Sequence, residues 1–223
     1  MSLPALAGSF MVTPVRVTLS AAEPIVALTV RNDSSDPTVV QIEMTTWSQE
    51  AGKDLHAATR EVIATPPIFT VAAGATQVVR VGLRRSADPD RELTYRLFLQ
   101  EVPPPPKPEF KGLRVALRMS IPVFVVPPVA VAPALEWRAV REPQGWLNVS
   151  VRNAGKAHVQ IADFRLEHAD GKEIARQAPS TYVLPGQRRD WRLKGEATPG
   201  EVLRMLARTD AGDMRAEVPL DSR

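Results

Sequence analysis

The chain has 223 residues, of which 44% are hydrophobic and 24% charged, with a formal net charge of +3. This composition excludes a disordered chain, suits two small domains, and contains no apolar run of the roughly 20 residues that a membrane-spanning helix needs. Cysteine is absent, which excludes disulfides, thiolate metal sites and a cysteine nucleophile. Lysine and arginine are interspersed with carboxylates, so nothing indicates a nucleic-acid partner.

The first ten residues, MSLPALAGSF, contain a small-residue Ala-Leu-Ala segment of the kind found near a secretory cleavage site. They lack the charged start and the full apolar core of an intact leader. We interpret them as a leader remnant or as an artificial or wrongly assigned start.

The 21 prolines argue against long helices, and short runs rich in Val, Ile, Thr and Leu recur between turn signals. Such spacing predicts an all-β chain of antiparallel sandwiches. In the first half the predicted strands are Met11–Leu19, Ile25–Arg31, Val39–Trp47, Gln77–Leu83, Leu93–Val102 and Leu113–Val126. In the second half they are Trp146–Arg152, His158–Leu166, Thr181–Leu184, Asp190–Leu193 and Met214–Val218. One further segment, Val202–Arg208, favours a helix by composition but equally fits a strand.

The two halves of the chain repeat a short motif. Thr29–Asn32 (TVRN) returns as Ser150–Asn153 (SVRN), and a polar turn and Val-Gln-Ile follow each copy. A strand, a turn and a second strand predict a hairpin in each half. With the proline-rich connector Pro127–Leu135, the repeat predicts two related domains, residues 9–127 and 130–223.

The longest regular pattern runs from Leu113 to Val123, where every odd position is apolar and the even positions are Arg, Ala, Arg, Ser and Pro. A period of two predicts a β-strand with one apolar face. The preceding loop, Val102–Gly112, holds five prolines. A poorly pairing loop before a long strand indicates a sheet edge that meets another chain, although most such strands simply face their own core.

Catalytic and metal-binding patterns are missing. The three histidines, His56, His158 and His168, lack metal-ligand spacing, and we interpret them as solvated or turn residues. The sequence has no G-x-S-x-G elbow and no phosphate-binding glycine loop. An acidic turn at Asp88, Asp90 and Glu92 is better explained by solvation than by a cation. The four tryptophans fit a sandwich core better than a sugar-binding platform.

Several motifs in the first half resemble the periplasmic pilus-assembly chaperones of chaperone–usher systems. They are Thr46–Glu50 with Trp47, Ile63–Pro67 followed by Ala73-Gly74 and Val79–Val81, Tyr95–Pro104, and the strand Leu113–Phe124. Looser motifs in the second half are Gly145-Trp146 and Arg152–Ala154. The resemblance implies two immunoglobulin-like domains arranged as a boomerang, and a divergent short-loop or archaic-type branch.

The resemblance also implies donor-strand complementation, in which the chaperone lends a strand to a pilus subunit that lacks its own last strand. The side chains that match the inserted ones are Leu113, Val115, Leu117 and Met119.

The family holds the subunit's terminal carboxylate with two cations. Arg16, expected on the first strand, matches the first, and a guanidinium binds a carboxylate through two parallel hydrogen bonds. Pro122 stands where many members carry a lysine, so we expect Arg118 or Arg96 to supply the second cation.

Four further residues match structural positions of the family. Thr65-Pro66 matches a bond that the family often holds cis, although trans is the default for most such bonds. Arg80 and Glu92 match positions of buried polar contacts near the domain boundary.

The leading hypothesis is a non-enzymatic periplasmic chaperone without cofactor or metal, whose partners are pilus subunits and an outer-membrane usher, with no membrane insertion. The alternative is a two-domain adhesin or carbohydrate-binding module on the same fold, since a fold alone does not decide function. An enzyme is the weakest hypothesis, because no nucleophile, base or metal set is present.

Overall fold

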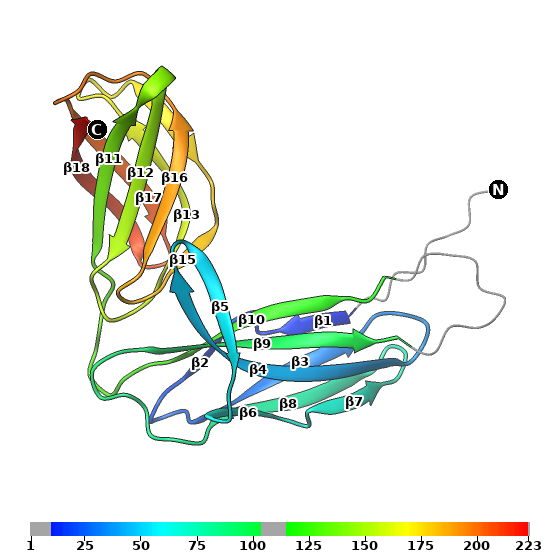
Figure 1. Cartoon of the computed structure of the whole chain (residues 1–223). Helices are drawn as coiled ribbons and strands as arrows, with labels where there is room; N and C mark the ends of the chain where they lie inside the picture. The colour runs from blue at the N-terminus through cyan, green and yellow to red at the C-terminus, as the bar shows by residue number, and fades with distance from the viewer. Residues whose placement is uncertain (1–9, 104–114, 223) are drawn as a thin grey trace, which may run out of the picture. The chain divides into compact units, whose positions relative to one another are not determined.

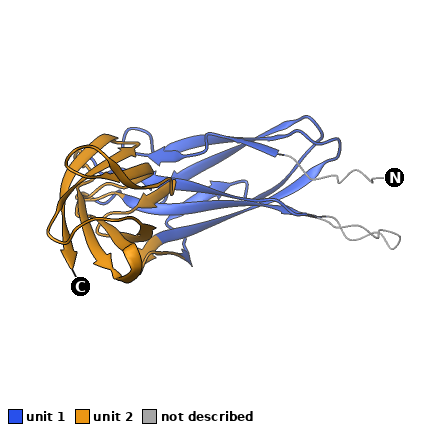
Figure 2. Cartoon of the chain, turned by 90° about the horizontal axis from the view of Figure 1, so that it is seen from above, with its two compact units in different colours: residues 1–47, 56–88, 93–128 blue, residues 48–55, 89–92, 129–223 orange. Residues whose placement is uncertain are grey.

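The computed structural model describes residues 10–103 and 115–222, and this part of the chain contains no α-helix (Figure 1). The prediction of an all-β chain with two β-sandwich domains is confirmed. Unit 1 comprises residues 1–47, 56–88 and 93–128, and unit 2 comprises residues 48–55, 89–92 and 129–223 (Figure 2). The division at residues 128 and 129 lies in the predicted connector, but the expected limits assigned 48–55 and 89–92 to the first domain.

Unit 1 packs two sheets face to face. The first has the order β1 (Phe10–Thr13), β3 (Ile25–Asn32), β8 (Thr76–Leu83) and β6 (Val62–Thr65). The second has the order β2 (Val17–Leu19), β10 (Arg118–Val125), β9 (Leu93–Val102), β4 (Thr38–Glu50) and β5 (Lys53–Ala58), with β7 (Ile68–Val71) also paired to β4.

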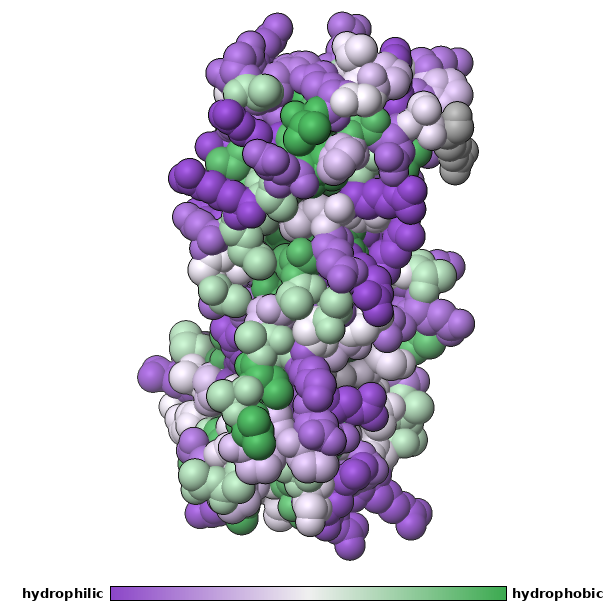
Figure 3. Space-filling view, turned by 90° about the vertical axis from the view of Figure 1, so that its left-hand side faces the viewer, coloured by the Kyte–Doolittle hydropathy of each residue, from purple (hydrophilic) through white to green (hydrophobic). Residues whose placement is uncertain are grey.

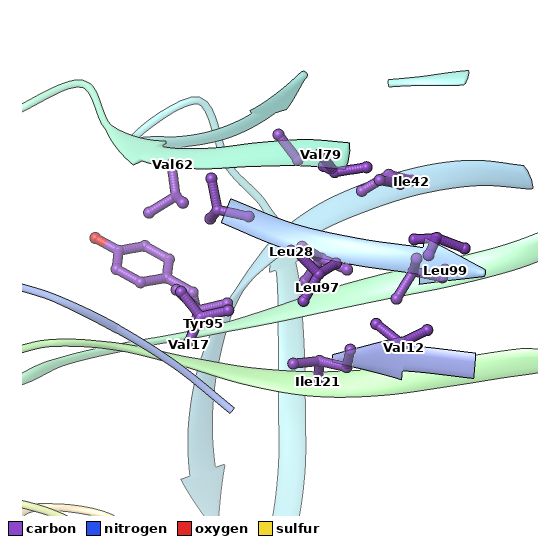
Figure 4. Packing of buried hydrophobic residues seen from close by; sticks show 14 of the residues in the cluster. Val12, Val17, Leu28, Ile42, Val62, Val79, Tyr95, Leu97, Leu99 and Ile121 are labelled. Atoms are coloured by element: carbon purple, nitrogen blue, oxygen red, sulfur yellow. The ribbon is translucent and has the colours of Figure 1, made fainter. Parts of the chain in front are cut away.

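The core of unit 1 lies between these sheets because each strand turns alternate apolar residues inward. Figure 4 shows Val12, Leu28, Ile42, Val79, Leu97 and Ile121 pointing toward one another from six different strands. Valine and leucine dominate the cluster, as expected where side chains stand on a pleated surface.

Unit 2 forms a second sandwich with its own core. Its strands are ordered β14 (Glu173–Gln177), β13 (Val159–Glu167), β17 (Val202–Thr209), β18 (Gly212–Ser222), β11 (Leu135–Glu142), β12 (Trp146–Asn153) and β16 (Arg188–Lys194). The short β15 (Thr181–Val183) pairs with β13, and a single 3-10 turn, Pro143–Gly145, precedes β12. The segment 202–208, for which the sequence analysis allowed either a helix or a strand, lies in β17.

The predicted first strand, Met11–Leu19, is two strands. β1 pairs with β3, whereas β2 pairs with β10 in the opposite sheet. The break follows from Pro14, which has no N–H to donate to a ladder. Arg16 therefore lies in an exposed bend between β1 and β2, and its expected place on a strand is wrong.

The repeated motif forms a corner rather than a hairpin, so the hairpin prediction is wrong. β3 and β4 lie in different sheets, and β12 and β13 are not paired with each other. Each motif ends in a fully buried asparagine. The Asn32 Nδ2 donates to the carbonyls of Asp36 (2.7 Å) and Val71 (3.0 Å), and its Oδ1 accepts the N–H of Ser34.

Asn153 repeats this arrangement in unit 2. Its Nδ2 donates to the carbonyls of Ala157 (2.8 Å) and Val183 (3.1 Å), and its Oδ1 accepts the N–H of Gly155. Each asparagine thus bonds the residue two positions on, the residue four positions on and a distant strand. A short amide side chain supplies both the donors and the acceptor that such a corner needs.

The exposed apolar side chains of the described residues are scattered over many elements. The face in Figure 3 mixes hydrophilic and hydrophobic residues over both units. Of the exposed apolar side chains, Val115, just ahead of β10, bears directly on the candidate site.

We expect Asn32→Ala and Asn153→Ala each to cost about 2–4 kcal/mol of unfolding free energy, because buried carbonyls lose their donor. Calorimetry should show Asn32→Ala lowering the transition of unit 1 and Asn153→Ala that of unit 2. The matched control is Asn148→Ala on the half-exposed face of β12, which should change stability by under about 0.5 kcal/mol. Equal effects of the three substitutions would contradict the corner role.

Candidate functional site

Burial in the core of unit 1 decreases gradually along β10, from its C-terminal end to the residues that precede it. All its odd-numbered residues face the same side, and Val125, Val123 and Ile121 are at most 2% exposed. Met119 and Leu117 are only partly buried against the same core, and Val115 is 60% exposed. One apolar face therefore runs without a break from the sandwich into solvent. Leu113 lies outside the described residues.

The main-chain hydrogen bonds of β10 also alternate in direction with a period of two residues. Glu101 donates its N–H to the Leu117 carbonyl at 2.9 Å, so odd residues of β10 bond to β9 and even residues turn their polar groups to the other edge. At that edge β2 pairs only with Val123–Val125. Among the described residues, no strand covers the edge at Arg118 and Ser120.

Pro122 fits this arrangement because it lies at an even position, where an N–H would face away from β9. Arg96 on β9 is the residue directly opposite Pro122 in the register of the two strands. Arg16 lies in the bend immediately before β2, whose pairing with β10 begins at Val17 and Val123. Of the predicted cations, Arg96 therefore lies beside Pro122, and Arg16 lies in the bend that leads into β2.

Arg96 lies on an aromatic base. Its guanidinium carbon lies 3.6 Å from the centre of the Trp47 ring, and Trp47 contacts Phe124 with ring centres 6.0 Å apart. Trp47 and Phe124 are both almost fully buried. This cation–π contact restricts the guanidinium of Arg96.

Arg118, the other predicted cation, lies four residues from Pro122, about 13 Å along the strand. It pairs with Glu43 at 3.3 Å and lies 4.3 Å from the centre of the Phe98 ring. The register therefore places Arg96 beside Pro122 and Arg118 four residues away from that proline.

The residues predicted to have structural roles agree with the structure in some cases and disagree in others. The Thr65–Pro66 bond is cis, as the resemblance implies. Arg80 is exposed on β8, because Val79 and Val81 on either side turn into the core, so its predicted buried contact is wrong. Glu92 is 6% exposed and accepts the main-chain N–H of His158 at 3.1 Å.

His158 directly follows a bend, as the turn alternative expects, but the solvated alternative is wrong for it. Its side chain is 13% exposed, its Nδ1 lies 2.6 Å from Glu92 Oε1, and its Nε2 lies 3.8 Å from Asp210. This cluster fixes the segment 89–92 within unit 2. His168 likewise lies against Glu201, with Nδ1 and Oε1 2.5 Å apart. The hydrogen bond from His168 holds the pKa of Glu201 below its usual value, helped by the main-chain N–H of Thr198.

A buried phenol lies on the core side of β9, one residue before Arg96 and on the opposite face of the sheet. Tyr95 is 2% exposed, and its hydroxyl donates to Glu61 Oε2 at 2.6 Å, while Arg85 pairs with the other oxygen at 2.8 Å. Burial, followed by the bond to Glu61, raises the pKa of Tyr95. The bonds from Tyr95 and then Arg85 lower the pKa of Glu61. This triad joins β9 to the loop before β6.

The other candidate sites gain no support. Trp137 and Trp191 stack with ring centres 6.1 Å apart and pack, partly buried, with Phe164 against the core of unit 2, where the sequence analysis favours tryptophans. Within residues 10–103 and 115–222, no group of three metal-ligating side chains is assembled. In the same residues, no helix is long and apolar enough to cross a membrane.

Two shallow hollows lie on the outer face of β13, β17 and β18. In their register Leu206 has an arginine on each of its four sides, Arg165, Arg204, Arg208 and Arg215. An acid occupies each corner of this three-by-three array, Asp163, Glu167, Asp213 and Glu217. None of the predicted site residues lines these hollows.

The described residues form two β-sandwich domains, and the first has an open strand edge on β10, next to the strand that carries Arg96. Residues 9–130, more than half of the chain, match the family model described as pili and flagellar-assembly chaperone, PapD N-terminal domain. The chain therefore belongs to the family of pilus-assembly chaperones of the chaperone–usher pathway.

Solved structures agree on the fold. A chain of the CsuC–CsuE chaperone–tip adhesion subunit complex from archaic pili of Acinetobacter baumannii has a TM-score of 0.71 and 20% identity, covering 95% of this chain and 99% of that chain. The E. coli chaperone DraB has a TM-score of 0.65 and 21% identity, with 98% and 99% covered. A chain of the Salmonella enterica SafA pilin–SafB chaperone complex has a TM-score of 0.66 and 20% identity, with 96% and 98% covered. A sequence search of curated proteins gave no match.

We expect Glu61→Gln to lower stability at pH 7 by less than about 1 kcal/mol, because the carboxylate is partly exposed. A carboxyl whose pKa is lowered on folding stabilises the protein above its unfolded pKa, and this contribution is lost as the pH falls through the folded value. Thermal unfolding should therefore show a difference between wild type and Glu61→Gln at pH 7. That difference should shrink once the pH falls below 4.5, the usual pKa of a glutamate side chain, and vanish below the lowered pKa of the folded state. A difference that grows on acidification would contradict the triad.

Proposed function

We propose that this chaperone captures pilus subunits in the periplasm by lending the open edge of β10, together with the segment before it, to complete their fold. The observation that carries the proposal is the continuous apolar face that leaves the core of unit 1 between Ile121 and Val115. Since the neighbouring edge is not covered by β2, an added strand can pair with it.

Two sets of groups would divide the work of binding. Main-chain groups of Arg118 and Ser120 pair with a subunit strand and set its register, whatever its side chains. Val115, Leu117 and Met119, with Leu113 before them, fill the apolar groove of a subunit that lacks one strand. Each side chain contributes about 1.5–3 kcal/mol before the costs of association.

The subunit's terminal carboxylate would bind at the cations beside Pro122. Arg96 lies opposite Pro122 in the register and Arg16 lies in the bend just before β2, whereas Arg118 lies about 13 Å from Pro122 along β10. We therefore assign Arg96, rather than Arg118, as the second anchor. The Trp47 ring restricts the guanidinium of Arg96, and a guanidinium binds a carboxylate with two parallel hydrogen bonds.

The complexes among the similar structures support the class of partner. One is a chaperone with a tip adhesion subunit and another is a pilin with its chaperone. In our proposal the captured subunit is kept from premature polymerisation and is delivered to an outer-membrane usher. There another subunit's strand replaces the lent one, and the folding energy held back in the complex drives the exchange without ATP.

The function is tested by purifying the tagged chain from the periplasm and identifying copurified proteins by mass spectrometry. A pilin with an apolar groove should be recovered in near-equal amount. Recovery of the chain alone from cells that are assembling pili, or glycan binding without a pilin, would favour the adhesin alternative.

We expect Val115→Asp to reduce pilin recovery at least tenfold without changing the thermal unfolding of the free chain, because Val115 is exposed until a subunit covers it. Val129→Asp is the matched control, since Val129 is 65% exposed and lies in unit 2. Leu117→Asp should also impair capture, but it will destabilise unit 1 as well, because Leu117 packs against the core. Normal recovery with Val115→Asp would reject the assigned face.

We expect Arg16→Ala and Arg96→Ala each to cut pilin recovery about tenfold or more, because each removes one charged partner of a bound carboxylate. Arg80→Ala is the control, since Arg80 is an exposed strand arginine of the same unit. A pilin lacking its terminal carboxylate through amidation should bind wild type and both variants equally weakly. Full recovery with Arg96→Ala would mean that the second anchor lies elsewhere.

A further inference from the structure

The base of the lent segment is Leu117 and Arg118, where regular pairing with β9 begins. The Leu117 carbonyl accepts the Glu101 N–H at 2.9 Å, as in a regular antiparallel pair. The Leu117 N–H, however, is donated to the side-chain Oε2 of Glu101 at 3.2 Å. A carboxylate therefore stands in for a main-chain carbonyl at the end of this ladder.

This bond marks a fixed point in the register. A regular pair exchanges two main-chain hydrogen bonds, and a slip by one residue would turn every side chain to the opposite face. The Glu101 carboxylate accepts the amide directly opposite its own residue. It therefore holds Leu117 opposite Glu101, with Val115 and Ala116 exposed beyond it.

The side chain of Arg118 is held on the outer face of the same sheet. It pairs with Glu43 of β4 at 3.3 Å and covers the Phe98 ring of β9 at 4.3 Å. The register brings Glu43 and Phe98 side by side, so one arginine crosses two strands. His56 of β5 packs edge-on against the same Phe98 ring, with ring centres 5.3 Å apart.

We propose that Glu43 and Glu101 form a clamp that holds the base of the lent segment in register, ready for a subunit, and that Arg118 is a positioning residue of this clamp. The proposal rests on the function proposed above. A segment whose base is already ordered loses less conformational freedom on binding, which raises affinity without a new contact to the subunit. Arg118 then acts through Glu43, not through the subunit's carboxylate.

A charge swap separates the clamp from an anchor. Arg118→Glu places two acids together and should weaken binding of the copurified pilin about three- to fivefold. Arg118→Glu combined with Glu43→Arg restores the pair with reversed charges and should return affinity to within about twofold of wild type. If Arg118 instead bound the subunit's carboxylate, the double variant would stay as weak as the single one, and the proposal would be overturned.

Hydrogen exchange of the free chain tests the clamp without a subunit. Glu101→Ala removes the acceptor and should speed exchange of the Leu117 amide about fivefold. Glu101→Gln keeps an oxygen acceptor and should change the rate by less than about twofold. An unchanged rate in Glu101→Ala overturns the clamp. If wild type captures no pilin while this exchange pattern holds, the proposed function fails and the clamp does not.

Discussion

The register between β9 and β10 is the constraint on which the other features of unit 1 depend. It turns Ile121 and Val123 into the core, and by the same two-residue period it places Val115 on the continuation of that face. It also directs the polar groups of even residues to the uncovered edge and sets Arg96 beside Pro122. A slip by one residue would bury the arginines and expose the core, so hydrophobic packing of the sandwich enforces the geometry of the site.

Much of the fold could be predicted because its signals are local. Alternation over Leu93–Val102 gave the bounds of β9, and the TVRN and SVRN repeats located two related domains. The hairpin predicted from each repeat was wrong, because the same pattern of strand, asparagine and polar turn also forms a corner between two sheets. β5 was missed because all six of its residues are exposed, so it has no apolar period to detect.

The site was predicted less completely because its contacts join distant residues. The apolar period marked Leu117 and Met119, and the resemblance marked Arg16. The second cation stayed open between Arg118 and Arg96, and only the strand order shows that Arg96 lies opposite Pro122. The bond between Glu92 and His158 joins residues 66 positions apart, so no local sequence pattern predicts it. Arg80 was assigned to buried contacts by analogy, whereas its place between two core valines turns it outward.

Pro122 lies on the edge of β10 that β2 leaves uncovered, because β2 runs parallel to β10 and begins at the pair Val17–Val123. The N–H that proline lacks would point to this edge, so residue 122 offers no donor to an added strand. The residues before β2 do not continue along the edge either, since Pro14 separates β2 from β1, which pairs with β3 in the other sheet. The polypeptide thus leaves its own sheet incomplete here, with two imino acids at the places where its own backbone would otherwise continue the pairing.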